Sequence, residues 1–374
     1  MKIHNIFVGT DLKFIPNYVR MTQHYGLFDR SEFHFFSDNY QKILSLKPIL
    51  KPHVHPINDD GFKKVLNLLR PGDTIVFHAF SHAQYPFIKK IPPDIKKVWI
   101  FWGYEGYHAM YYSSLVDNKS WLAANKHKGT KVFIKHLLKK YFLQHIKRYG
   151  IQTREIIKHM DVCATWDLWG HEFVKKINPD IQTIHFSYYP AEWMFWPEEV
   201  PPMTIHKNIL LGNSVSYTNN HIEALHYLKK ISSSFDKVYL PLSYGNQSHY
   251  LENVIQTGKH LLGDKFIPLT QFLPLEDYNQ LFNNMRLVWM NHIRQQAAGN
   301  IFTALAYGKP VVLHPKSHMH YTFSRWGLKT FNPKNIPELM NHNPQENIRS
   351  ENHRIVWEKL SLHQNKSFFD LIRR

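Results

Sequence analysis

Two successive runs of alternating strands and helices, separated by a proline-rich segment, constrain the fold of this chain more than any other feature. Short apolar segments alternate with helix-forming segments up to residue 186, and the same alternation restarts at residue 208. The predicted strands are 2–8, 33–36, 74–77, 97–101, 162–164 and 183–186, then 208–211, 237–240, 266–268, 287–291 and 310–313. Such alternation is typical of parallel α/β sheets covered by helices. We therefore predict two α/β halves, with ligands bound beyond the carboxyl ends of the strands.

The segment from Pro190 to Pro202 has the composition of an interdomain linker. We predict an N-terminal domain over 1–195, a C-terminal domain over 205–345, and a helical tail over 346–374 that packs back on the N-terminal domain. The chain has 374 residues, 43% of them hydrophobic, which is enough for two cores of ordinary size. The single cysteine, Cys163, lies in a predicted strand and is expected to be an inert core thiol.

The chain opens with a predicted strand in place of the charged-then-apolar pattern of a signal peptide. No apolar run approaches the ~18 residues that cross a bilayer, so we expect a cytoplasmic protein. Lys and Arg number 46 against 29 Asp and Glu, a formal charge of +17. This excess favours anionic partners, which include nucleic acid, acidic lipid and phosphorylated substrates, without choosing among them.

One segment concentrates this positive charge. Between Lys126 and Arg148, basic residues accompany apolar ones in the pattern of a basic amphipathic helix. Such a helix can lie on an anionic membrane surface. It can also be an ordinary surface helix, with its apolar face in the core and its basic face in solvent, and the sequence leaves both interpretations open.

Two strand-to-helix connections in the C-terminal half carry candidate phosphate-binding groups. Glycine lets a ligand approach the backbone closely, and the start of a helix presents unpaired amides to an anion. An arginine pairs with phosphate oxygens through a fork of donors, so the second connection predicts a cradle for a diphosphate without a P-loop lysine. By itself, each pattern is also that of an ordinary polar turn. The residues are Gly212, Asn213 and Ser214 in the first connection, and Arg294, Gln295, Gln296, Gly299 and Asn300 in the second.

A third candidate follows a strand of the N-terminal half. Trp102, Glu105 and Tyr107 place a carboxylate among aromatic rings just after the predicted strand 97–101. A carboxylate in this place is positioned to act as a general base, and burial by the rings can tune its pKa. By itself, the pattern is also that of an exposed loop acid near a core tryptophan. His78, just beyond another strand, could face the same site.

Histidine pairs are frequent, but no third ligand that would complete a metal site is evident, so we predict satisfied or exposed histidines and no metal. The pairs and clusters are His53 with His55, His78 with His82, and His314 and His318 with His320. The chain contains no Asp-x-Asp, no Gly-x-Gly-x-x-Gly and no P-loop motif. These absences disfavour metal-dependent diphosphate clamps, dinucleotide oxidoreductases and P-loop enzymes.

Several of these residues together resemble a known family. They are Gly212-Asn213-Ser214, the run Asn219–Leu225, Pro241 with Tyr244, Arg294-Gln295-Gln296 with Gly299, Gly308–Leu313, Phe77-His78, and Trp102-Gly103 with Glu105 and Tyr107. The pattern is similar to that of the TDP-N-acetylfucosamine:lipid II N-acetylfucosaminyltransferases, glycosyltransferase family 56. The resemblance extends over about 208–313 and is patchy before residue 190.

The resemblance implies a GT-B fold, with two Rossmann-like domains facing across a cleft, and a metal-independent glycosyltransferase without a cofactor. It implies a TDP-linked sugar donor and a polyprenyl-diphosphate-linked saccharide acceptor, at the inner face of the bacterial inner membrane, as in enterobacterial common antigen synthesis. The 294–300 connection would then hold the diphosphate, with the 212–214 loop against it and Tyr244 at the base or ribose. Glu105 would deprotonate the acceptor, with His78, Trp102 and Tyr107 on the acceptor side.

Three departures from the family pattern concern the donor sugar and its base. The acid of the Trp-Gly motif is Glu105 where the family usually has aspartate, residues 215–217 lack the expected charges, and 314–320 is rich in histidine. Two other functions remain alternatives. A basic nucleic-acid-binding protein fits the charge, but no known binding module is present and no nucleic acid is expected. A non-catalytic nucleotide-sugar-binding partner would use the same pocket without turnover.

Overall fold

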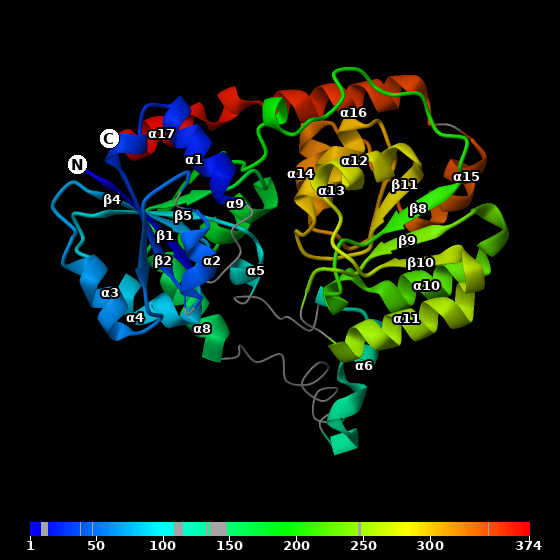
Figure 1. Cartoon of the computed structure of the whole chain (residues 1–374), viewed down its shortest axis with the longest axis horizontal. Helices are drawn as coiled ribbons and strands as arrows, with labels where there is room; N and C mark the ends of the chain where they lie inside the picture. The colour runs from blue at the N-terminus through cyan, green and yellow to red at the C-terminus, as the bar shows by residue number, and fades with distance from the viewer. Residues whose placement is uncertain are drawn as a thin grey trace. The chain divides into compact units, whose positions relative to one another are not determined.

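The predicted alternation of strands and helices produces two parallel sheets, each in its own unit of the chain (Figure 1). The computed structural model describes residues 1–8, 14–37, 39–46, 48–107, 115–131, 134, 148–245, 248–342 and 344–374. Unit 1 comprises Met1–Met110, Ile146–Pro190 and Leu360–Arg374, and unit 2 comprises Tyr111–His145 and Ala191–Lys359. The prediction of an α/β chain with two parallel sheets is confirmed.

Within the described residues, a seven-stranded parallel sheet forms the centre of unit 1, in the order β3-β2-β1-β4-β5-β6-β7. The bounds are β1 (Ile3–Val8), β2 (Ser31–Phe36), β3 (Pro52–His55), β4 (Thr74–His78), β5 (Lys96–Ile100), β6 (Val162–Ala164) and β7 (Gln182–Ile184). The order reverses between β1 and β4, so the carboxyl ends of these strands flank a topological switch point. Every residue of β4 is buried, which explains the apolar run Ile75–Phe77 at its centre. Cys163 in β6 is buried as predicted.

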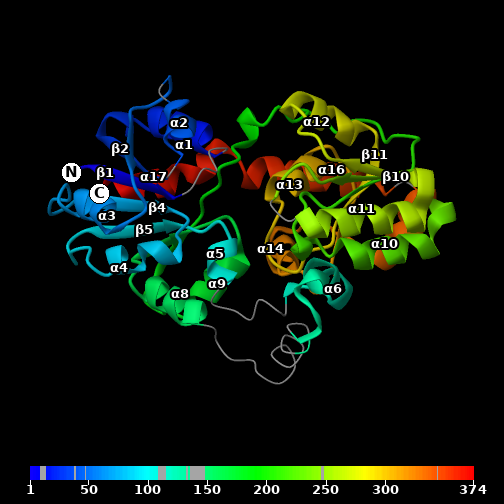
Figure 2. The same ribbon diagram turned by 60° about the horizontal axis from the view of Figure 1, so that its bottom comes forward.

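Helices cover both faces of this sheet (Figures 1 and 2). Their bounds are α1 (Ile15–His24), α2 (Tyr40–Leu44), α3 (Asp59–Leu66), α4 (Tyr85–Ile88), α5 (Tyr104–Tyr107), α8 (Arg148–Lys158), α9 (Leu168–Lys175) and α17 (Lys366–Arg373). The C-terminal α17 packs beside α1, where the rings of Tyr25 and Phe369 stack 4.5 Å apart. On the other face, Phe62 of α3 stacks on Phe36 of β2 at 4.4 Å. The last helix of the chain is therefore part of the N-terminal unit.

Unit 2 contains, among the described residues, a five-stranded parallel sheet in the order β10-β9-β8-β11-β12. The bounds are β8 (Asn208–Leu211), β9 (Val238–Pro241), β10 (Phe266–Leu269), β11 (Met285–Met290) and β12 (Val311–Leu313). The first strand along this unit again lies inside the sheet, and the order reverses between β8 and β11. The switch point of unit 2 therefore lies between the two connections that the sequence singled out for phosphate binding.

The helices of unit 2 also lie on both faces of their sheet (Figure 1). Their bounds are α6 (Asn118–Asn125), α10 (His221–Lys230), α11 (Ser248–Leu262), α12 (Leu275–Asn283), α13 (Ala298–Ala306), α14 (Met319–Trp326), α15 (Ile336–Asn341) and α16 (Glu346–Lys359). Helices α10 and α11 pack together on one face with α6, and α13 packs against α16 on the other. Arg349 of α16 donates from Nε to the backbone oxygen of Gly308 at 3.1 Å, which ties α16 to the end of α13.

Helix α6 comes from the first half of the sequence but packs in unit 2. The backbone N–H of Ser120 donates to Glu223 Oε1 at 3.0 Å, and the Ser120 hydroxyl donates to Oε2 of the same carboxylate. Glu223 therefore accepts an otherwise unpaired amide of the first turn and places negative charge at the helix N-terminus. The observed division into units, which assigns 111–145 to unit 2, therefore differs from the predicted domain boundary at residue 195. It also differs at the C-terminal tail, where α16 lies in unit 2 and only Leu360–Arg374 packs in unit 1.

Much of the predicted basic helix between Lys126 and Arg148 lies outside the described residues, namely 132–133 and 135–147. At its start, Lys126–Lys128 forms a single 3-10 turn. None of the helices within the described ranges combines the length and the apolar character that are needed to cross a membrane.

Candidate functional site

The loops after β8 and β11 meet beside the switch point of unit 2. Gln296 joins them, because its Nε2 donates to Asn213 Oδ1 at 2.9 Å and its Oε1 accepts the Thr218 hydroxyl at 2.7 Å. A second link is reciprocal: the side-chain amides of Asn220 and Asn291 each donate to the backbone oxygen of the other at 3.0 Å. The structure thus brings together the two predicted phosphate-binding connections.

The loop after β8 depends on glycine at its first position. Gly212 has φ +71°, and a Cβ at this position would lie 2.6 Å from Nε2 of His221. Asn219 shapes the rest of the loop, since its Nδ2 donates to the backbone oxygen of Ser214 at 3.0 Å and to its hydroxyl at 3.2 Å. Because both atoms of Ser214 bond to Asn219, Ser214 holds the loop in shape.

Arg294 is half-buried in the loop after β11. Its Nη1 lies 3.4 Å from the backbone oxygen of Gln295, and its Nε is buried without an acceptor among the residues that the structure describes. Helix α13 starts directly after this loop, where Ala297 has φ +58° and its side chain provides no cap. Uncapped amides at a helix start and a buried N–H without an acceptor both favour an anion in this place.

The other residues of the predicted cradle divide into two groups. Gln295 is buried, and Gly299 lies half-buried at the second position of α13. Asn300 instead donates from Nδ2 to the Tyr278 hydroxyl at 2.8 Å, a bond that connects α13 to α12. The structure therefore gives Asn300 a structural contact, and leaves Arg294 and the start of α13 as the groups that can receive an anion.

His292 was missed by sequence reasoning, and its ring contacts the backbone of Arg294. Burial and the neighbouring Arg294 charge lower the pKa of His292 to about 3, so its ring is neutral at physiological pH. Its Nδ1 lies 2.9 Å from the backbone oxygen of Arg294 and therefore carries the proton. A neutral His292 fixes the backbone of Arg294 without adding a charge. In the sequence, the one signal for this role was a histidine placed after a buried strand.

Tyr244 follows β9, next to the loop after β8. Its backbone oxygen accepts the N–H of Val215 at 2.8 Å, and its side chain is 54% exposed. An exposed aromatic ring held beside a phosphate-binding loop can stack on a base.

Two further residues near the same end of the sheet come from distant parts of the chain. Asp117, just before α6, donates its backbone N–H to Asn220 Oδ1 at 2.8 Å, and its Oδ2 lies 3.1 Å from Nε2 of His314. The segment before α6 thereby docks next to the switch point. Nothing in the local sequence around Asp117 predicts this contact, because its partners are more than 100 residues away.

In unit 1, Glu105 lies directly after β5, at the start of α5. Its side chain is buried, and its Oε1 accepts the indole N–H of Trp99 at 3.1 Å and the backbone N–H of Trp102 at 2.8 Å. The alternative of an exposed loop acid is therefore wrong, because Glu105 is a buried carboxylate that holds the turn between β5 and α5.

His78 and Trp102 meet through Tyr188, which sequence reasoning missed. The Tyr188 hydroxyl lies 2.6 Å from Nδ1 of His78 and accepts the indole N–H of Trp102 at 3.2 Å. Nε2 of His78 lies 3.4 Å from Asn5 Oδ1, and burial holds the pKa of His78 well below its usual range. His78 is therefore neutral, with a proton on Nε2 and the Tyr188 hydroxyl donating to Nδ1.

Aromatic rings surround this hydrogen-bonded group. Phe14 stacks on Tyr188 with centroids 4.8 Å apart and meets Trp102 edge-on at the same distance. Tyr107 lies elsewhere, fully buried and stacked on Trp169 at 5.2 Å. The structure thus brings His78 and Trp102 together and gives Tyr107 a place in the core.

Side chains of metal-binding type come together at one place among the described residues, namely His4, Glu32 and His34 in unit 1. These residues lie within β1 and β2, while the predicted sites follow the carboxyl ends of the strands.

Comparison with known proteins agrees with this geometry. The family model described as 4-alpha-L-fucosyltransferase, glycosyl transferase group 56, matches residues 156–355. Among solved structures, a glycosyltransferase from Rickettsia africae is 12% identical with a TM-score of 0.66, covering 100% of this chain and 99% of that one. Anabaena Alr3699/HepE in complex with UDP is 11% identical with a TM-score of 0.66, covering 100% of both chains. Trehalose-6-phosphate synthase from Burkholderia multivorans is 8% identical with a TM-score of 0.61, covering 100% and 98%.

At these identities the structural likeness concerns the fold. It confirms the predicted fold of the GT-B type, and the family match confirms the predicted family.

Proposed function

Since this chain belongs to glycosyl transferase group 56 and is a glycosyltransferase, we propose that it transfers an amino-deoxy sugar such as N-acetylfucosamine from a thymidine diphosphate donor. The acceptor is a saccharide linked to polyprenyl diphosphate, used in surface polysaccharide synthesis at the cytoplasmic face of the bacterial inner membrane. The family match supports sugar transfer, and the chemistry of the site supports a nucleotide diphosphate donor.

The observation that carries the donor assignment is the buried Nε of Arg294 at the start of α13. This N–H has no acceptor among the described residues, and the adjacent helix start has no side-chain cap. A diphosphate supplies acceptors to both, through charge-assisted hydrogen bonds that are about twice as strong as neutral ones. Gln296 fixes the loop after β11 against the loop after β8 before any ligand binds.

These groups also act on the reaction itself. When the bond between the anomeric carbon and the diphosphate oxygen breaks, negative charge develops on the leaving diphosphate. A guanidinium and helix amides already aimed at that position stabilise the developing charge without reorganisation. No metal is required for this step, because the cationic and dipolar groups are supplied by the chain.

Glu105 is the proposed acceptor of the proton from the attacking hydroxyl. Its support is its position directly after β5 and its environment of Trp99 and Trp102, whose N–H groups both bond to Oε1. Of the group His78, Trp102 and Tyr188, only Trp102 is partly exposed, so Trp102 is the ring against which a sugar can pack. The formal charge of +17 suits an acceptor that carries a diphosphate.

Thermal-shift measurements with the diphosphates of thymidine, uridine, guanosine and cytidine, and with their sugars, test this proposal. A ligand that binds only the native state raises the melting temperature in proportion to its affinity. We expect thymidine diphosphate and its sugar to give the largest shift, and Arg294→Ala to abolish most of it.

Arg325→Ala is the matched control, because Arg325 is an arginine of α14 in the same unit whose guanidinium stacks on Tyr321. Its ligand-induced shift should equal that of the wild type. The donor assignment is wrong if no nucleotide stabilises the wild type, or if Arg294→Ala and Arg325→Ala respond alike.

A further inference from the structure

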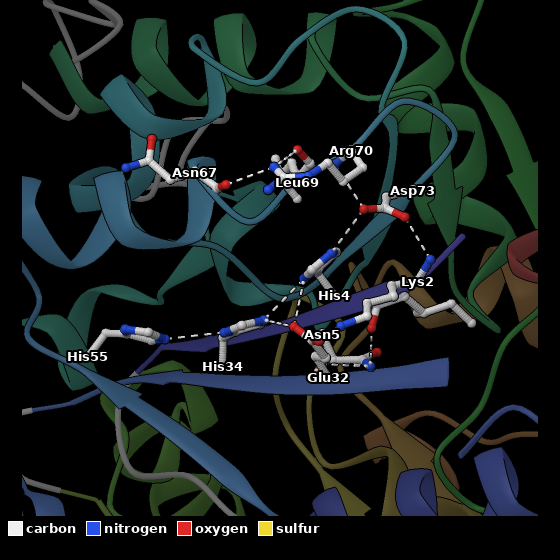
Figure 3. A network of polar contacts seen from close by, with 11 residues as sticks. Lys2, His4, Asn5, Glu32, His34, His55, Asn67, Leu69, Arg70 and Asp73 are labelled. Carbon is white, nitrogen blue, oxygen red and sulfur yellow. Dashed lines mark hydrogen bonds and ion pairs between the residues drawn. The ribbon is translucent and has the colours of Figure 1, made fainter. Parts of the chain in front are cut away.

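A second group of chemically active side chains, none of them assigned to sugar transfer, lies on the sheet of unit 1 (Figure 3). His4 of β1 and Glu32 of β2 are directly paired in register, and His34 is two residues further along β2. Side chains alternate along a strand, so all three lie on the same face of the sheet. His4 and Glu32 are the second residues of their strands and His34 is the fourth residue of β2, whereas His78 is the last residue of β4.

Three atoms of these side chains converge on one point. Nδ1 of His4 lies 3.2 Å from Nε2 of His34, and these two atoms lie 3.5 and 3.6 Å from Oε2 of Glu32. Around a tetrahedral zinc ion with bonds of about 2.0–2.1 Å, neighbouring ligand atoms are separated by about 3.3 Å. The three atoms therefore already have the spacing of one face of a zinc coordination tetrahedron.

The proton on His4 is placed by Asp73. Nε2 of His4 lies 3.3 Å from Asp73 Oδ2, and the same carboxylate accepts the backbone N–H groups of Lys2 and Arg70 at 2.6 and 2.9 Å. A carboxylate that already accepts two backbone N–H groups acts as an acceptor toward His4 as well, which places the proton of His4 on Nε2. Its Nδ1 is then a lone pair aimed at Glu32 and His34.

The ring of His34 is fully buried. Its Nδ1 lies 3.2 Å from Nε2 of His55, which can accept a proton from it. With the proton on Nδ1, the tautomer that an ion at this point would select, Nε2 of His34 presents its lone pair 3.2 Å from Nδ1 of His4. Two imidazole nitrogens and a carboxylate oxygen are then the donor atoms that metal ions bind.

We propose that His4, Glu32 and His34 bind one divalent transition-metal ion, with zinc preferred and a water molecule as the fourth ligand. Histidine nitrogens and a carboxylate oxygen are standard zinc ligands. Asp73 and His55 hold the second nitrogens of the two ligating rings, as outer-shell partners do in zinc sites. The rest of the site is closed by the protein, since the side chains of His4 and His34 are at most 1% exposed.

The ion has a route to the site. The Glu32 side chain is 20% exposed, so solvent reaches its carboxylate. Its other oxygen, Oε1, pairs with the Lys2 ammonium, and the Lys2 side chain is 60% exposed and can extend into solvent. Oε1 of Glu32 therefore pairs with Lys2, and Oε2 faces the imidazole rings of His4 and His34.

Metal binding here stabilises the sheet of unit 1. The ion links β1 to β2 directly, and Asp73 extends the link to the turn before β4. β1 lies beside the middle strand β4, and β2 lies beside β1. An ion that binds only the folded form raises stability by mass action. The test therefore measures metal content and stability rather than sugar transfer, and it stands whether or not the proposed donor is right.

The experiment uses the full chain, with any affinity tag removed and metal stripped by a chelator. We expect the stripped wild type to bind one equivalent of Zn²⁺ in calorimetry, to gain melting temperature on binding, and to show the visible absorption of tetrahedral Co²⁺ when cobalt replaces zinc. Glu32→Gln, which keeps the side-chain volume and removes the charge, should bind Zn²⁺ at least tenfold more weakly.

Glu155→Gln is the matched control, since Glu155 is another partly exposed acid of unit 1, paired with Lys158 at 2.9 Å. It should bind Zn²⁺ like the wild type. If circular dichroism shows Glu32→Gln to be unfolded, Asp73→Asn replaces it, with an expected loss of 10–100-fold in affinity. The site is refuted if the stripped wild type takes up no stoichiometric zinc, if the cobalt form is not tetrahedral, or if the variants of Glu32 or Asp73 bind zinc as tightly as Glu155→Gln.

Discussion

The two sheets share their strand order around the switch point, but the polar groups beyond their carboxyl ends are arranged differently. In unit 2, Gln296 and Asn220 join two loops, and a buried N–H of Arg294 has no acceptor within the described part of the chain. In unit 1, the Tyr188 hydroxyl satisfies both His78 and Trp102 beneath a set of aromatic rings.

The difference is between incomplete and complete hydrogen bonding. A buried donor without an acceptor costs free energy that an anionic ligand removes when it binds. A satisfied group under aromatic rings offers stacking surface and little charge. We therefore expect unit 2 to determine nucleotide affinity, and unit 1 to determine the rate of reaction with the acceptor.

The largest effect that would sharpen this comparison is expected from Glu105→Gln. Glutamine keeps an oxygen that can accept the N–H groups of Trp99 and Trp102, so the fold should survive. Loss of the general base should lower kcat about 10²–10⁴-fold, while nucleotide affinity stays unchanged. Steady-state kinetics with a lipid-linked acceptor measure kcat, and thermal shifts measure the affinity. A variant with normal kcat would make Glu105 a residue that only positions α5 and Trp102.

Arg294→Ala should give the next largest effect, with the opposite signature. Removing a donor aimed at the developing charge typically costs about 10²–10³-fold in rate, and nucleotide binding should weaken with it. The melting temperature without ligand should change little, because the Arg294 side chain makes a single long hydrogen bond within the described residues, 3.4 Å to the backbone oxygen of Gln295. If Arg294→Ala keeps activity and nucleotide affinity within threefold of the wild type, unit 2 does not determine nucleotide affinity through Arg294.

Acid should destabilise both units, because both bury neutral histidines. Burial lowers the pKa of His34 in unit 1 to about 2, and those of His221 and His292 in unit 2 to about 3, whereas the unfolded chain titrates near 6.5. The unfolded state then binds more protons below about pH 6.5, so stability is complete above that pH and falls as pH falls. At pH 5 the loss is about 2 kcal/mol for each such histidine. Urea unfolding at pH 8 and pH 5 measures it, and equal stabilities would contradict the neutral assignments.

The smallest effect is expected from Tyr188→Phe. Removing the hydroxyl leaves His78 and Trp102 without a shared partner, a cost of about 1–2 kcal/mol in the free energy of unfolding. Nucleotide binding should not change. Tyr85→Phe is the control, since the Tyr85 hydroxyl has no hydrogen bond among the described residues, and its stability should match the wild type. If Tyr188→Phe is as stable as this control, the Tyr188 hydroxyl does not provide stabilising hydrogen bonds to His78 and Trp102.

Much of the sheet architecture was predictable. The apolar segments at 74–77, 162–164 and 208–211 became β4, β6 and β8 almost unchanged, since strands buried on both faces read as short apolar runs. Strand β3 (Pro52–His55) was not predicted, because this edge strand is only partly buried and its sequence, Pro-His-Val-His, lacks an apolar run. Neither helix α6 nor the unit that contains it was predicted, because the first turn of this helix is held by hydrogen bonds to the distant Glu223.

The candidate sites were predictable to a different degree. Gly212 and Arg294 stand out because glycine after a strand and arginine before a helix have local chemical meaning. Asp117, Tyr188 and His292 carry no such local signal, and their roles come from partners distant in the sequence or from burial. The histidine pair His53 and His55 was expected to lack a converging ligand, yet the sheet brings His34 beside both rings.

The sequence by itself determined the class of the fold, the family and the chemistry available at each strand end, because apolar periodicity and residue type are local properties of the chain. Only the tertiary structure decided which of these side chains meet. Strand order places β8 beside β11 and β1 beside β2, and thereby creates the Arg294 site and the His4, Glu32 and His34 cluster. Pairing between parallel strands joins residues separated by whole helices, so no local pattern encodes it.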